Sequence, residues 1–300
     1  MRLMRCRIAA LVVTWNRRND VLECVQSLLQ VDSDVLQVYV VDNASEDGTS
    51  EALKNAFPSI HLLRSEKNLG FGGGNNLGLT RILNDGADAV FLVNDDVVVA
   101  PDALGIMVSA FDNQSIGVVG PKILVYGTDD LIWAAGGKVD DNTGIAIQRH
   151  YAERDYGQAD QPMDVDYAVG CAMLVRTGII RKVGKFDIRY YMYYEEAEWC
   201  RRIRRSGYRV VYLPDACVWH KVSIGDKSRN NAPYYFSRNR LLYLKSCGLS
   251  EIKIACLAVS DILQSALAHA VKGRTHESHL MIRGVLDYYK GDFGRLRIMT

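Results

Sequence analysis

Residues 90–99, VFLVNDDVVV, decide the fold class, because an apolar run of strand length ends there in two adjacent carboxylates. We expect a strand over residues 89–93, with Asp95 and Asp96 directly after its carboxyl end. β-Branched residues follow the pair, so helix capping does not explain it, and the next helix is expected near Pro101. Carboxylate oxygens on a rigid strand end suit Mg²⁺ or Mn²⁺ bound to a diphosphate. Two solvated turn aspartates are the alternative.

The first 120 residues alternate short apolar runs with helical periodicity, which is the pattern of βαβ units on a mostly parallel sheet. The expected elements are strands at Ile8–Thr14, 35–41 and 60–63, and helices that follow a cap at Asn19 or Asp20, span 50–57, and span 75–84. Thr14, Asp42 and the aspartate pair then lie at the carboxyl ends of strands, where open α/β sheets bind their ligands. This convergence favours a binding crevice over solvated turns.

A glycine-rich run, NLGFGGGNNLG at 68–78, follows the third expected strand. Its spacing does not match the dinucleotide fingerprint, because Asn75 and Leu77 stand where the last glycine is required, so a Rossmann dehydrogenase is disfavoured. We expect a flexible loop that approaches a ligand closely, with Asn68 and Asn75 available for hydrogen bonds. A tight turn that needs positive φ is an equal alternative.

The second half of the chain is less regular. Residues 125–165 are expected to form a long excursion or a small antiparallel addition, before an apolar run at 168–175. A helix is expected from Glu196 to Gly207, then a strand at 209–213, Pro214, and an apolar turn up to His220. Residues 226–232 are polar, and the chain beyond Tyr234 is expected to be helical to about residue 290.

Two adjacent carboxylates follow the aromatic run 190–194. Glu196 lies 3, 4 and 7 residues before Trp199, Cys200 and Ile203, so it is expected to begin a buried stripe and to act as a general base in an aromatic-walled pocket. Favourable charge at a helix N-terminus is the alternative. Successive helix residues point about 100° apart, so Glu195 is expected to orient the acceptor or the backbone instead. His220 alone would be read as structural, and only its neighbours make it a candidate ligand.

Composition indicates a globular protein, with 48% hydrophobic and 24% charged residues. The seven cysteines are scattered and never form C-x-x-C, so neither a disulfide framework nor a thiolate zinc site is expected, and the chain is expected to be cytoplasmic. The apolar stretch near the N-terminus is too short for a secretory signal. The longest apolar run, near 252–271, is broken by Asp261, so no membrane span is expected.

Charge is distributed unevenly along the chain. Residues 201–300 carry 18 basic and 7 acidic side chains, against 18 basic and 28 acidic side chains in residues 1–200. A basic C-terminal third suggests an anionic partner such as a membrane surface or a phosphorylated lipid, with a solvated basic face as the alternative. Nucleic acid is disfavoured, because no basic helix interleaved with aromatic residues stands out.

Several segments resemble the inverting family-2 glycosyltransferases of the GT-A fold, particularly the bacterial rhamnosyltransferase-like branch that acts in surface polysaccharide assembly. They run in the expected order over roughly residues 8–245: VVDNASEDGT (40–49), NLGFGGGNNLGL (68–79), VNDD (93–96), YAVGCAMLVR (167–176), VGKFDIRYYMYYEEAEWCRRIRRSGYRVVYLPDACVWHK (183–221) and YYFSRNRLLYL (234–244). The resemblance implies an α/β GT-A catalytic domain over 1–225, with a nucleotide-binding half over about 1–120 and an acceptor half over about 121–225. A mainly helical region over 226–300 would follow.

The resemblance also implies roles for single residues. A nucleoside-diphosphate sugar would be held by Thr14, Trp15, Asn16, Asp42, Asn68, Asn75 and Asp95, and Mn²⁺ or Mg²⁺ by Asp96 and His220. Gly170 and Cys171, with Glu195, would lie on the acceptor side. Most relatives carry Glu-Asp where this chain has Glu195-Glu196, and the aspartate is their base, so Glu196 would take that role with a side chain one methylene longer.

The implied reaction is a single displacement with inversion, from dTDP-rhamnose or a UDP-sugar to a saccharide acceptor that is lipid-linked. One competing hypothesis is a catalytically weak scaffold that binds nucleotide sugars in a polysaccharide assembly complex. Another is a sugar-nucleotide pyrophosphorylase, which would need a glycine-rich signature with arginine after the first strand. TWNRRND at 14–20 does not supply that signature.

Overall fold

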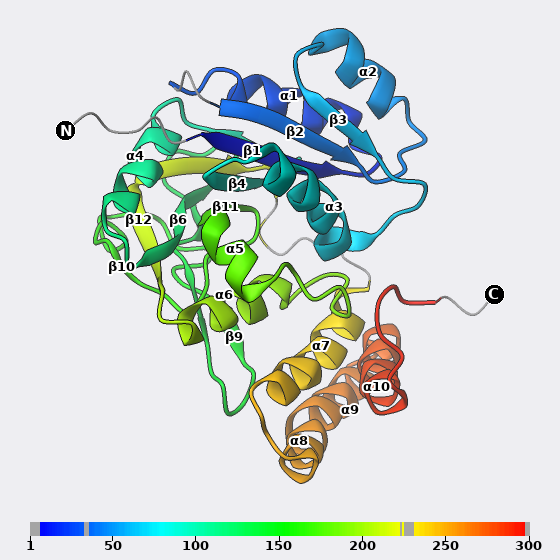
Figure 1. Cartoon of the computed structure of the whole chain (residues 1–300). Helices are drawn as coiled ribbons and strands as arrows, with labels where there is room; N and C mark the ends of the chain where they lie inside the picture. Colours follow the sequence, from blue (N-terminus) through cyan, green and yellow to red (C-terminus); the bar gives the residue numbers. More distant parts are fainter. Residues whose placement is uncertain (1–6, 33–35, 223, 225–230, 298–300) are drawn as a thin grey trace.

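A mixed, mostly parallel β-sheet flanked by helices forms the centre of the molecule (Figure 1). The computed structural model describes residues 7–32, 36–222, 224 and 231–297. Strands β1 (Ile8–Thr14), β2 (Leu36–Asp42), β3 (His61–Arg64) and β4 (Ala89–Asn94) are parallel, and the register sets Thr14 opposite Asp42 and Val13 opposite Asn94. The carboxyl ends of these strands therefore meet at one edge of the sheet, as the sequence predicts.

The second half of the sheet is built from both strand directions. β11 (Ala172–Arg176) is antiparallel to β4 and to β6 (Ile116–Val125), and β12 (Arg209–His220) is parallel to β6. The remaining strands are β5 (Val97–Val99) and β10 (Met163–Asp164) on β12, β7 (Ile132–Ala134) on β6, and the separate pair β8 (Gly137–Val139) and β9 (Ala146–Gln148). The excursion over 125–165 is thus the small antiparallel addition.

The helices of the first two hundred residues are α1 (Arg18–Leu28), α2 (Thr49–Ala56), α3 (Gly70–Asp85), α4 (Ala103–Ser109), the 3₁₀ turn η1 (Ala110–Asp112), α5 (Thr177–Val183) and α6 (Glu195–Arg205). Two expectations about this region are wrong. α1 begins at Arg18, so Asn19 and Asp20 lie in its first turn and do not cap it, and the Asp20 carboxylate pairs with Lys221 Nζ at 3.0 Å. The expected turn after 213 is strand: β12 continues to His220 through a register shift, since β6 and β5 pair with it there.

The expected glycine-rich loop is also wrong, because this segment is the first half of helix α3. A Cβ at Gly74 would lie 2.6 Å from Val13 Cγ1, and one at Gly78 would lie 2.3 Å from Leu11 Cδ1. The glycines therefore allow α3 to pack directly on β1, at the expense of helix propensity. At these two positions glycine is needed because core side chains lie too close for a Cβ. The segment is therefore helical, although glycine in isolation favours a flexible backbone.

The C-terminal region is helical, as predicted, and lies at one end of the molecule beside α6 (Figure 1). It comprises α7 (Ala232–Ser246), α8 (Glu251–Leu257), the π-helical segment η2 (Ala258–Leu263), α9 (Gln264–Val271) and α10 (Thr275–Lys290). Residues of α7, α8, η2 and α10 belong to the same hydrophobic cluster as the sheet. The expected polar segment 226–232 and the expected domain boundary at 225/226 lie almost wholly outside the described residues.

The stretch Glu251–Val271 corrects the expectation that Asp261 interrupts a membrane-length run. Within the described residues it is one helix long and apolar enough, by length and composition, to cross a membrane, and 22% of its most apolar window is buried. The Asp261 carboxylate is neutralised by Arg240 at 2.6 Å, so its charge does not interrupt the helix. Length and composition alone are weak evidence of a span.

Much of the charge asymmetry is compensated inside the protein. Within the described residues, basic side chains after residue 200 form ion pairs with acids before it: Arg201–Asp141, Arg202–Glu198, Arg204–Asp166, Arg209–Asp164 and Lys221 with Asp20 and Glu23. Five of the 18 basic side chains of residues 201–300 are therefore paired with acids of the preceding sequence, and the overall bias does not by itself indicate an anionic partner.

Close packing of α10 on α7 generates a stability prediction. A Cβ at Gly284 would lie 2.5 Å from the Tyr234 backbone oxygen and 3.1 Å from the Arg238 backbone nitrogen. Gly284→Ala must push the helices apart, and we expect it to lower the free energy of unfolding by about 1–3 kcal/mol. Gly105→Ala in α4, where the new methyl group meets no atom within 4 Å, is the control. Chemical denaturation that gives both variants the same midpoint would contradict the packing.

Candidate active site

A cavity of about 380 Å³ lies at the carboxyl end of β4. Its walls come from the β1–α1 loop, α3, the β4–β5 turn, β7, the segment before β11, the segment before α6, and the end of β12. The lining residues are Arg17, Phe71, Asn94, Asp96, Trp133, Gln148, Val169, Gly170, Cys171, Met192, Tyr193, Glu195, Glu196, His220, Lys221 and Val222. The cavity thus brings together both expected metal ligands, the expected base and the expected acceptor-side residues.

Strand pairing places the histidine beside the aspartate. β5 pairs antiparallel with β12 and sets Val97 opposite His220, and the Asp96 backbone oxygen accepts from the Lys221 backbone N–H at 2.8 Å. His220 Nε2 lies 3.0 Å from Asp96 Oδ1. Arg17 Nη1 donates to Asp96 Oδ2 and lies 3.6 Å from Asp95 Oδ1. Asp96 is therefore held by both Arg17 and His220, whereas among the described residues Asp95 is paired with Arg17 only.

The two aspartates are electrostatically different. Burial raises the pKa of Asp95 to about 7, and the negative charge of Asp96 adds to this effect. Burial acts on Asp96 as well, but the hydrogen bond and charge of His220 and the charge of Arg17 outweigh it and lower its pKa to about 2. Asp96 is therefore the carboxylate that stays ionised at neutral pH, and it is the better ligand for a cation.

Oxygen and imidazole donors at this position suit Mg²⁺ or Mn²⁺. Among the described residues no cluster of three or more His, Cys, Asp or Glu side chains has metal-binding geometry. Arg17 at present supplies the positive charge between the two carboxylates. The residues thus fit a divalent cation that Asp96 and His220 hold together with oxygens of a bound diphosphate, and they do not fit a cation held by protein ligands alone.

Glu195 and Glu196 face this site from the first turn of α6. Each has one carboxylate oxygen, Oε2, that is buried and has no hydrogen-bond partner among the described residues. Burial raises the pKa of both carboxyls, and the charge of Glu196 raises the pKa of Glu195 further. Buried carboxyl groups with a raised pKa in the wall of a cavity are candidates for proton transfer.

The expected buried stripe is wrong in one respect, because Glu195 is more deeply buried than Glu196, which is partly exposed. α6 is covered on nearly every side, so helical periodicity does not distinguish the two residues. Trp199 donates to the Gly184 backbone oxygen at 2.8 Å and packs on Phe186, away from the cavity. Glu196 is nevertheless beside the open space: a Cβ at Gly170 would lie 3.5 Å from its Cβ.

A second cavity, of about 440 Å³, adjoins the first and has Glu196 in its wall. Trp133, Gln148 and Tyr193 also line both cavities. The other walls of the second cavity are Ala146, Ile147, Tyr151, Tyr167, Tyr194, Ala197 and Phe236. Glu196 therefore lies between a charged cavity and an aromatic one.

The loop in front of α6 has an unusual backbone that α7 holds in place. Tyr191, Tyr193 and Tyr194 all have positive φ, between 65° and 73°. Asn239 Nδ2 donates to the backbone oxygens of Tyr190, Met192 and Tyr193 at 2.7–2.9 Å. Arg238, fully buried, donates to the Tyr190 backbone oxygen at 2.9 Å. The position of both glutamates therefore depends on a helix of the C-terminal region.

The expected nucleoside-binding residues surround the sheet edge but do not line the cavity. Thr14 is buried at the end of β1, and Trp15 beside it is half exposed. Asn16 joins two loops, because its backbone N–H donates to Ser45 Oγ at 2.9 Å and its Oδ1 accepts from the Glu46 backbone N–H. Their role in binding a nucleoside stays a prediction.

Three further expected ligands are engaged within the protein. Both oxygens of the fully buried Asp42 carboxylate accept hydrogen bonds, one from the Ser45 backbone N–H and one from Ser50 Oγ. Asn68 Oδ1 accepts from the Gly70 backbone N–H at 2.8 Å. Asn75 is buried inside α3 and donates to the Phe71 backbone oxygen. Asp42 and Asn68 shape the loops at the sheet edge, and Asn75 stabilises the first turns of α3.

Sequence reasoning missed Arg17, Trp133 and Tyr193. Arg17 could have been identified from its place in the loop after the first strand, because that strand ends at the same edge of the sheet as the strand before Asp95 and Asp96. Trp133 lies in the irregular excursion, and its ring centroid is 5.4 Å from that of His220. Because that segment lacks periodicity, only the three-dimensional structure places this tryptophan at the site.

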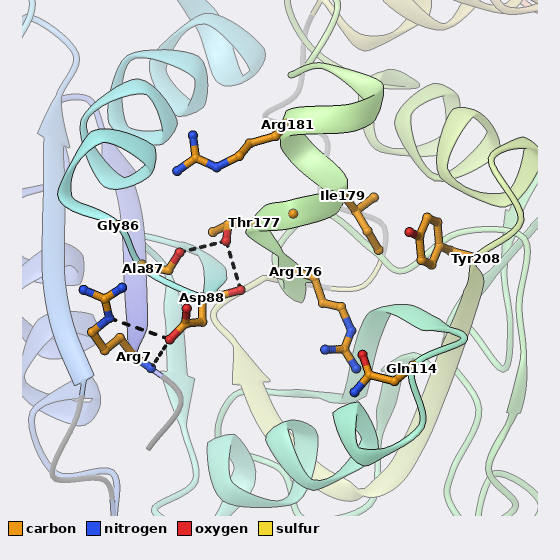
Figure 2. Close-up of a pocket in the computed structure, with 11 residues that line it drawn as sticks. Arg7, Gly86, Ala87, Asp88, Gln114, Arg176, Thr177, Ile179, Arg181 and Tyr208 are labelled. Carbon is orange, nitrogen blue, oxygen red and sulfur yellow. Dashed lines mark hydrogen bonds and ion pairs between the residues drawn. The ribbon is translucent and has the colours of Figure 1, made fainter. Parts of the chain in front are cut away.

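A larger cavity, of about 720 Å³, lies where β4 begins and β11 ends, at the opposite edge of the sheet (Figure 2). Its charged groups are occupied: Arg7 pairs with Asp88, and Arg176 donates to the Ile116 backbone oxygen at 2.8 Å. Thr177 Oγ1 donates to the backbone oxygens of Ala87 and Asp88 (Figure 2). Unlike the cavity at the carboxyl edge, it has no unpartnered buried carboxylate in its lining.

The chain is similar to known proteins both in sequence and in fold. The sequence model described as Glycosyl transferase family 2 matches residues 9–184. The N-acetylglucosaminyl-diphospho-decaprenol L-rhamnosyltransferase of Mycobacterium tuberculosis is 27% identical over 207 residues, which cover 62% of this chain and 66%, just under two thirds, of that protein. The dTDP-rhamnosyl transferase RfbF of Shigella flexneri is 24% identical over 253 residues, 81% of each chain.

Among solved structures, a mannosyltransferase from Pyrobaculum calidifontis in complex with GDP-Man and Mn²⁺ superposes with a TM-score of 0.57. It is 15% identical, and the match covers 96% of this chain and 88% of that one. This likeness shows the fold, which is the GT-A fold.

The raised pKa of Asp95 generates a prediction for the ligand-free protein. Folding raises this pKa from 3.8 to about 7, so ionisation of Asp95 destabilises the folded protein. This destabilisation is absent below about pH 4, grows between about pH 4 and about pH 7, and is complete above that. With a chelator present, we expect Asp95→Asn to be more stable than the parent by about 4 kcal/mol at pH 8 and nearly equal to it at pH 4. Asp129→Asn, at an exposed turn, is the control. A stability difference from the parent that is the same at both pH values would contradict the assignment.

Proposed function

Because the chain belongs to glycosyl transferase family 2, we propose that it transfers a sugar from a nucleoside-diphosphate sugar to a saccharide acceptor with inversion at the anomeric carbon. The observation that carries the proposal is a single cavity with the Asp96–His220 pair on one wall and Glu195 and Glu196 on another. The names of the rhamnosyltransferase relatives favour dTDP-rhamnose as donor, with a UDP-sugar as the alternative. The first of these names also favours a lipid-linked acceptor. We further propose that the protein acts in surface polysaccharide biosynthesis, on the cytoplasmic side of the membrane.

We propose that residues 1–225 are the catalytic domain, with the donor bound over its first 120 residues. Thr14, Trp15, Asn16, Asp42, Asn68, Asn75 and Asp95 would hold the nucleoside and ribose. Each Asp42 oxygen already accepts one hydrogen bond, from the Ser45 backbone N–H or from Ser50 Oγ, and keeps a second lone pair for the donor. Asp96 and His220 would hold Mn²⁺ or Mg²⁺, which when bound neutralises charge on the nucleoside-diphosphate leaving group.

We propose Glu196 as the general base. Its carboxylate accepts the proton of an acceptor hydroxyl, the hydroxyl oxygen forms a bond to the anomeric carbon, and the bond from that carbon to the diphosphate oxygen breaks. Its unpartnered buried oxygen and raised pKa support this role, because a base works best with a pKa close to the operating pH. Glu195 would orient the acceptor.

We propose that the aromatic cavity holds the acceptor. Its side chains offer flat apolar faces for a sugar ring, and the charged group in its lining is Glu196. Gly170 and Cys171 line the first cavity beside Glu196, and a Cβ at Gly170 would lie 3.3 Å from Phe71 Cζ and 3.5 Å from Glu196 Cβ. A larger residue than glycine would therefore crowd the base.

Donor binding should depend on a divalent cation through Asp96. We expect Asp96→Ala to lose the Mn²⁺-dependent part of nucleotide-sugar affinity in isothermal titration, a fall of about tenfold or more. The donor is the nucleotide sugar of a panel, led by dTDP-rhamnose, that most raises the melting temperature of the parent. Asp129→Ala should bind as the parent does. Unchanged affinity and unchanged Mn²⁺ dependence in Asp96→Ala would overturn the metal assignment.

Transfer should depend on Glu196 more than on Glu195. Glu196→Gln keeps the shape but cannot take the proton, so we expect turnover to fall by about 10²–10⁴-fold with donor affinity nearly intact. Because its pKa is raised, the parent's rate should rise with pH above the range of an ordinary glutamate, and this limb should be absent from the residual activity of Glu196→Gln.

Glu195→Gln is the matched variant and should act mainly on the acceptor KM. Glu196→Asp gives the shorter side chain of the relatives. Higher turnover than the parent would mean that the pocket still suits aspartate, and lower turnover would mean that it has adapted to glutamate. An active Glu196→Gln beside an inactive Glu195→Gln would reverse the two roles. Full activity of both would place the base elsewhere and would be evidence against the proposed chemistry at this site.

A further inference from the structure

The C-terminal helical hairpin carries an apolar face that no described part of the chain covers. Along Glu251–Val271, two stripes run on different sides of the helix. One is buried and consists of Ile254, Ala258, Ile262 and Ala266. The other is spaced by three or four residues, as one side of a helix requires, and consists of the exposed residues Ile252, Cys256, Val259, Leu267 and Val271, with the partly buried Leu263 among them. Val259, Leu267 and Val271 of this second stripe are 59%, 67% and 81% exposed.

α10 extends the same surface. Its exposed apolar residues Ile282, Leu286 and Tyr289 are again spaced by four and three residues. α10 runs beside α9 (Figure 1), and Tyr288 Oη donates to Glu251 Oε2 at 3.3 Å. The end of α10 that carries Tyr289 therefore lies next to the start of α8. We call the two stripes together the outer face.

We propose that the outer face binds the surface of an anionic lipid bilayer. An exposed apolar surface built from two adjacent helices is uncommon on a protein that acts alone in solution. Its residues are mainly aliphatic, whereas protein–protein interfaces are enriched in aromatic residues and arginine. A helix that lies in a membrane interface has this composition, with basic residues at its border.

The charges at the border fit an anionic surface. The acids nearest the stripe are neutralised within the protein, since Glu251 pairs with Lys245 and Asp261 with Arg240. The exposed cations Lys253, Lys272, Arg274 and Lys290 form no ion pair among the described residues, against one unpaired acid, Glu277, near the tip of the hairpin. Unlike the paired cations of α6 and β12, these are available to attract anionic headgroups.

The helix lies on the bilayer in this proposal and does not cross it. Its buried stripe packs into the hydrophobic cluster of the whole protein, and α10 is locked to α7 at Gly284. A crossing would withdraw Ile254, Ala258 and Ile262 from that cluster. The choice of a bilayer as occupant also rests partly on the proposed function, because a lipid-linked acceptor is presented at a membrane surface.

Flotation of the full chain with vesicles tests the proposal. We expect binding to phosphatidylcholine vesicles that contain phosphatidylglycerol, at least tenfold weaker binding without phosphatidylglycerol, and release by salt. Leu267→Ser combined with Val259→Ser should reduce binding at least tenfold. Leu29→Ser, at an exposed leucine after α1, is the matched control and should float as the parent does. Lys272→Ser with Arg274→Ser should reduce the preference for anionic lipid.

Each other occupant gives a distinct result. A dimer in sedimentation that Leu267→Ser dissociates, without flotation of the parent, would assign the face to a second copy and overturn the proposal. Flotation that survives alkaline carbonate would indicate a crossing helix and would also overturn it. Flotation needs no turnover, and donor binding measured without lipid should be unchanged in Leu267→Ser. Failure of this proposal is therefore distinguishable from failure of the glycosyltransferase chemistry.

Discussion

Two buried side chains of one helix hold the segment of the chain on which the site depends. Asn239 and Arg238 donate to backbone oxygens of the segment before α6, and both are fully buried. Left-handed tyrosines cost roughly 1–3 kcal/mol each unless the surroundings stabilise them, and a buried guanidinium is costly unless it is hydrogen-bonded. The loop and the two side chains stabilise each other. The loop keeps its strained backbone because the helix supplies donors, and the arginine stays buried because the loop supplies acceptors.

The other wall of the site depends on strand register. Asp96 and His220 are 124 residues apart and meet because β5, three residues long, pairs with the end of β12. A slip of one residue would turn His220 to the other side of the sheet. β12 reaches this position through a register shift after Leu213, so an irregularity in the strand is needed to bring the histidine to the aspartate.

Elements with strong local patterns could be predicted from the sequence, and elements set by distant contacts could not. β1 matches its expected bounds, and Asp96, Glu195 and Glu196 were identified because carboxylates follow an apolar strand and open a helix. The helical state of the glycine run could not be inferred, since it depends on space beside Leu11 and Val13. The depth of Glu195 could not be inferred either, because strands, loops and α7 together cover α6. The family resemblance located His220, which a lone histidine in a sequence does not reveal.

Arg17 gives the ligand-free site a property of its own. Its guanidinium already pairs with Asp96, so a divalent cation would not meet an unpaired carboxylate there. It would have to displace Arg17 from Asp96. If the proposed cation binds at Asp96, its uptake would be an exchange of one positive charge for another, and the net affinity would be the difference between the attraction of Asp96 for the cation and its attraction for Arg17. The displaced guanidinium stays tethered within a side-chain length of the same cavity. An arriving diphosphate would meet it there, so that cation and anion favour each other's binding through one mobile side chain.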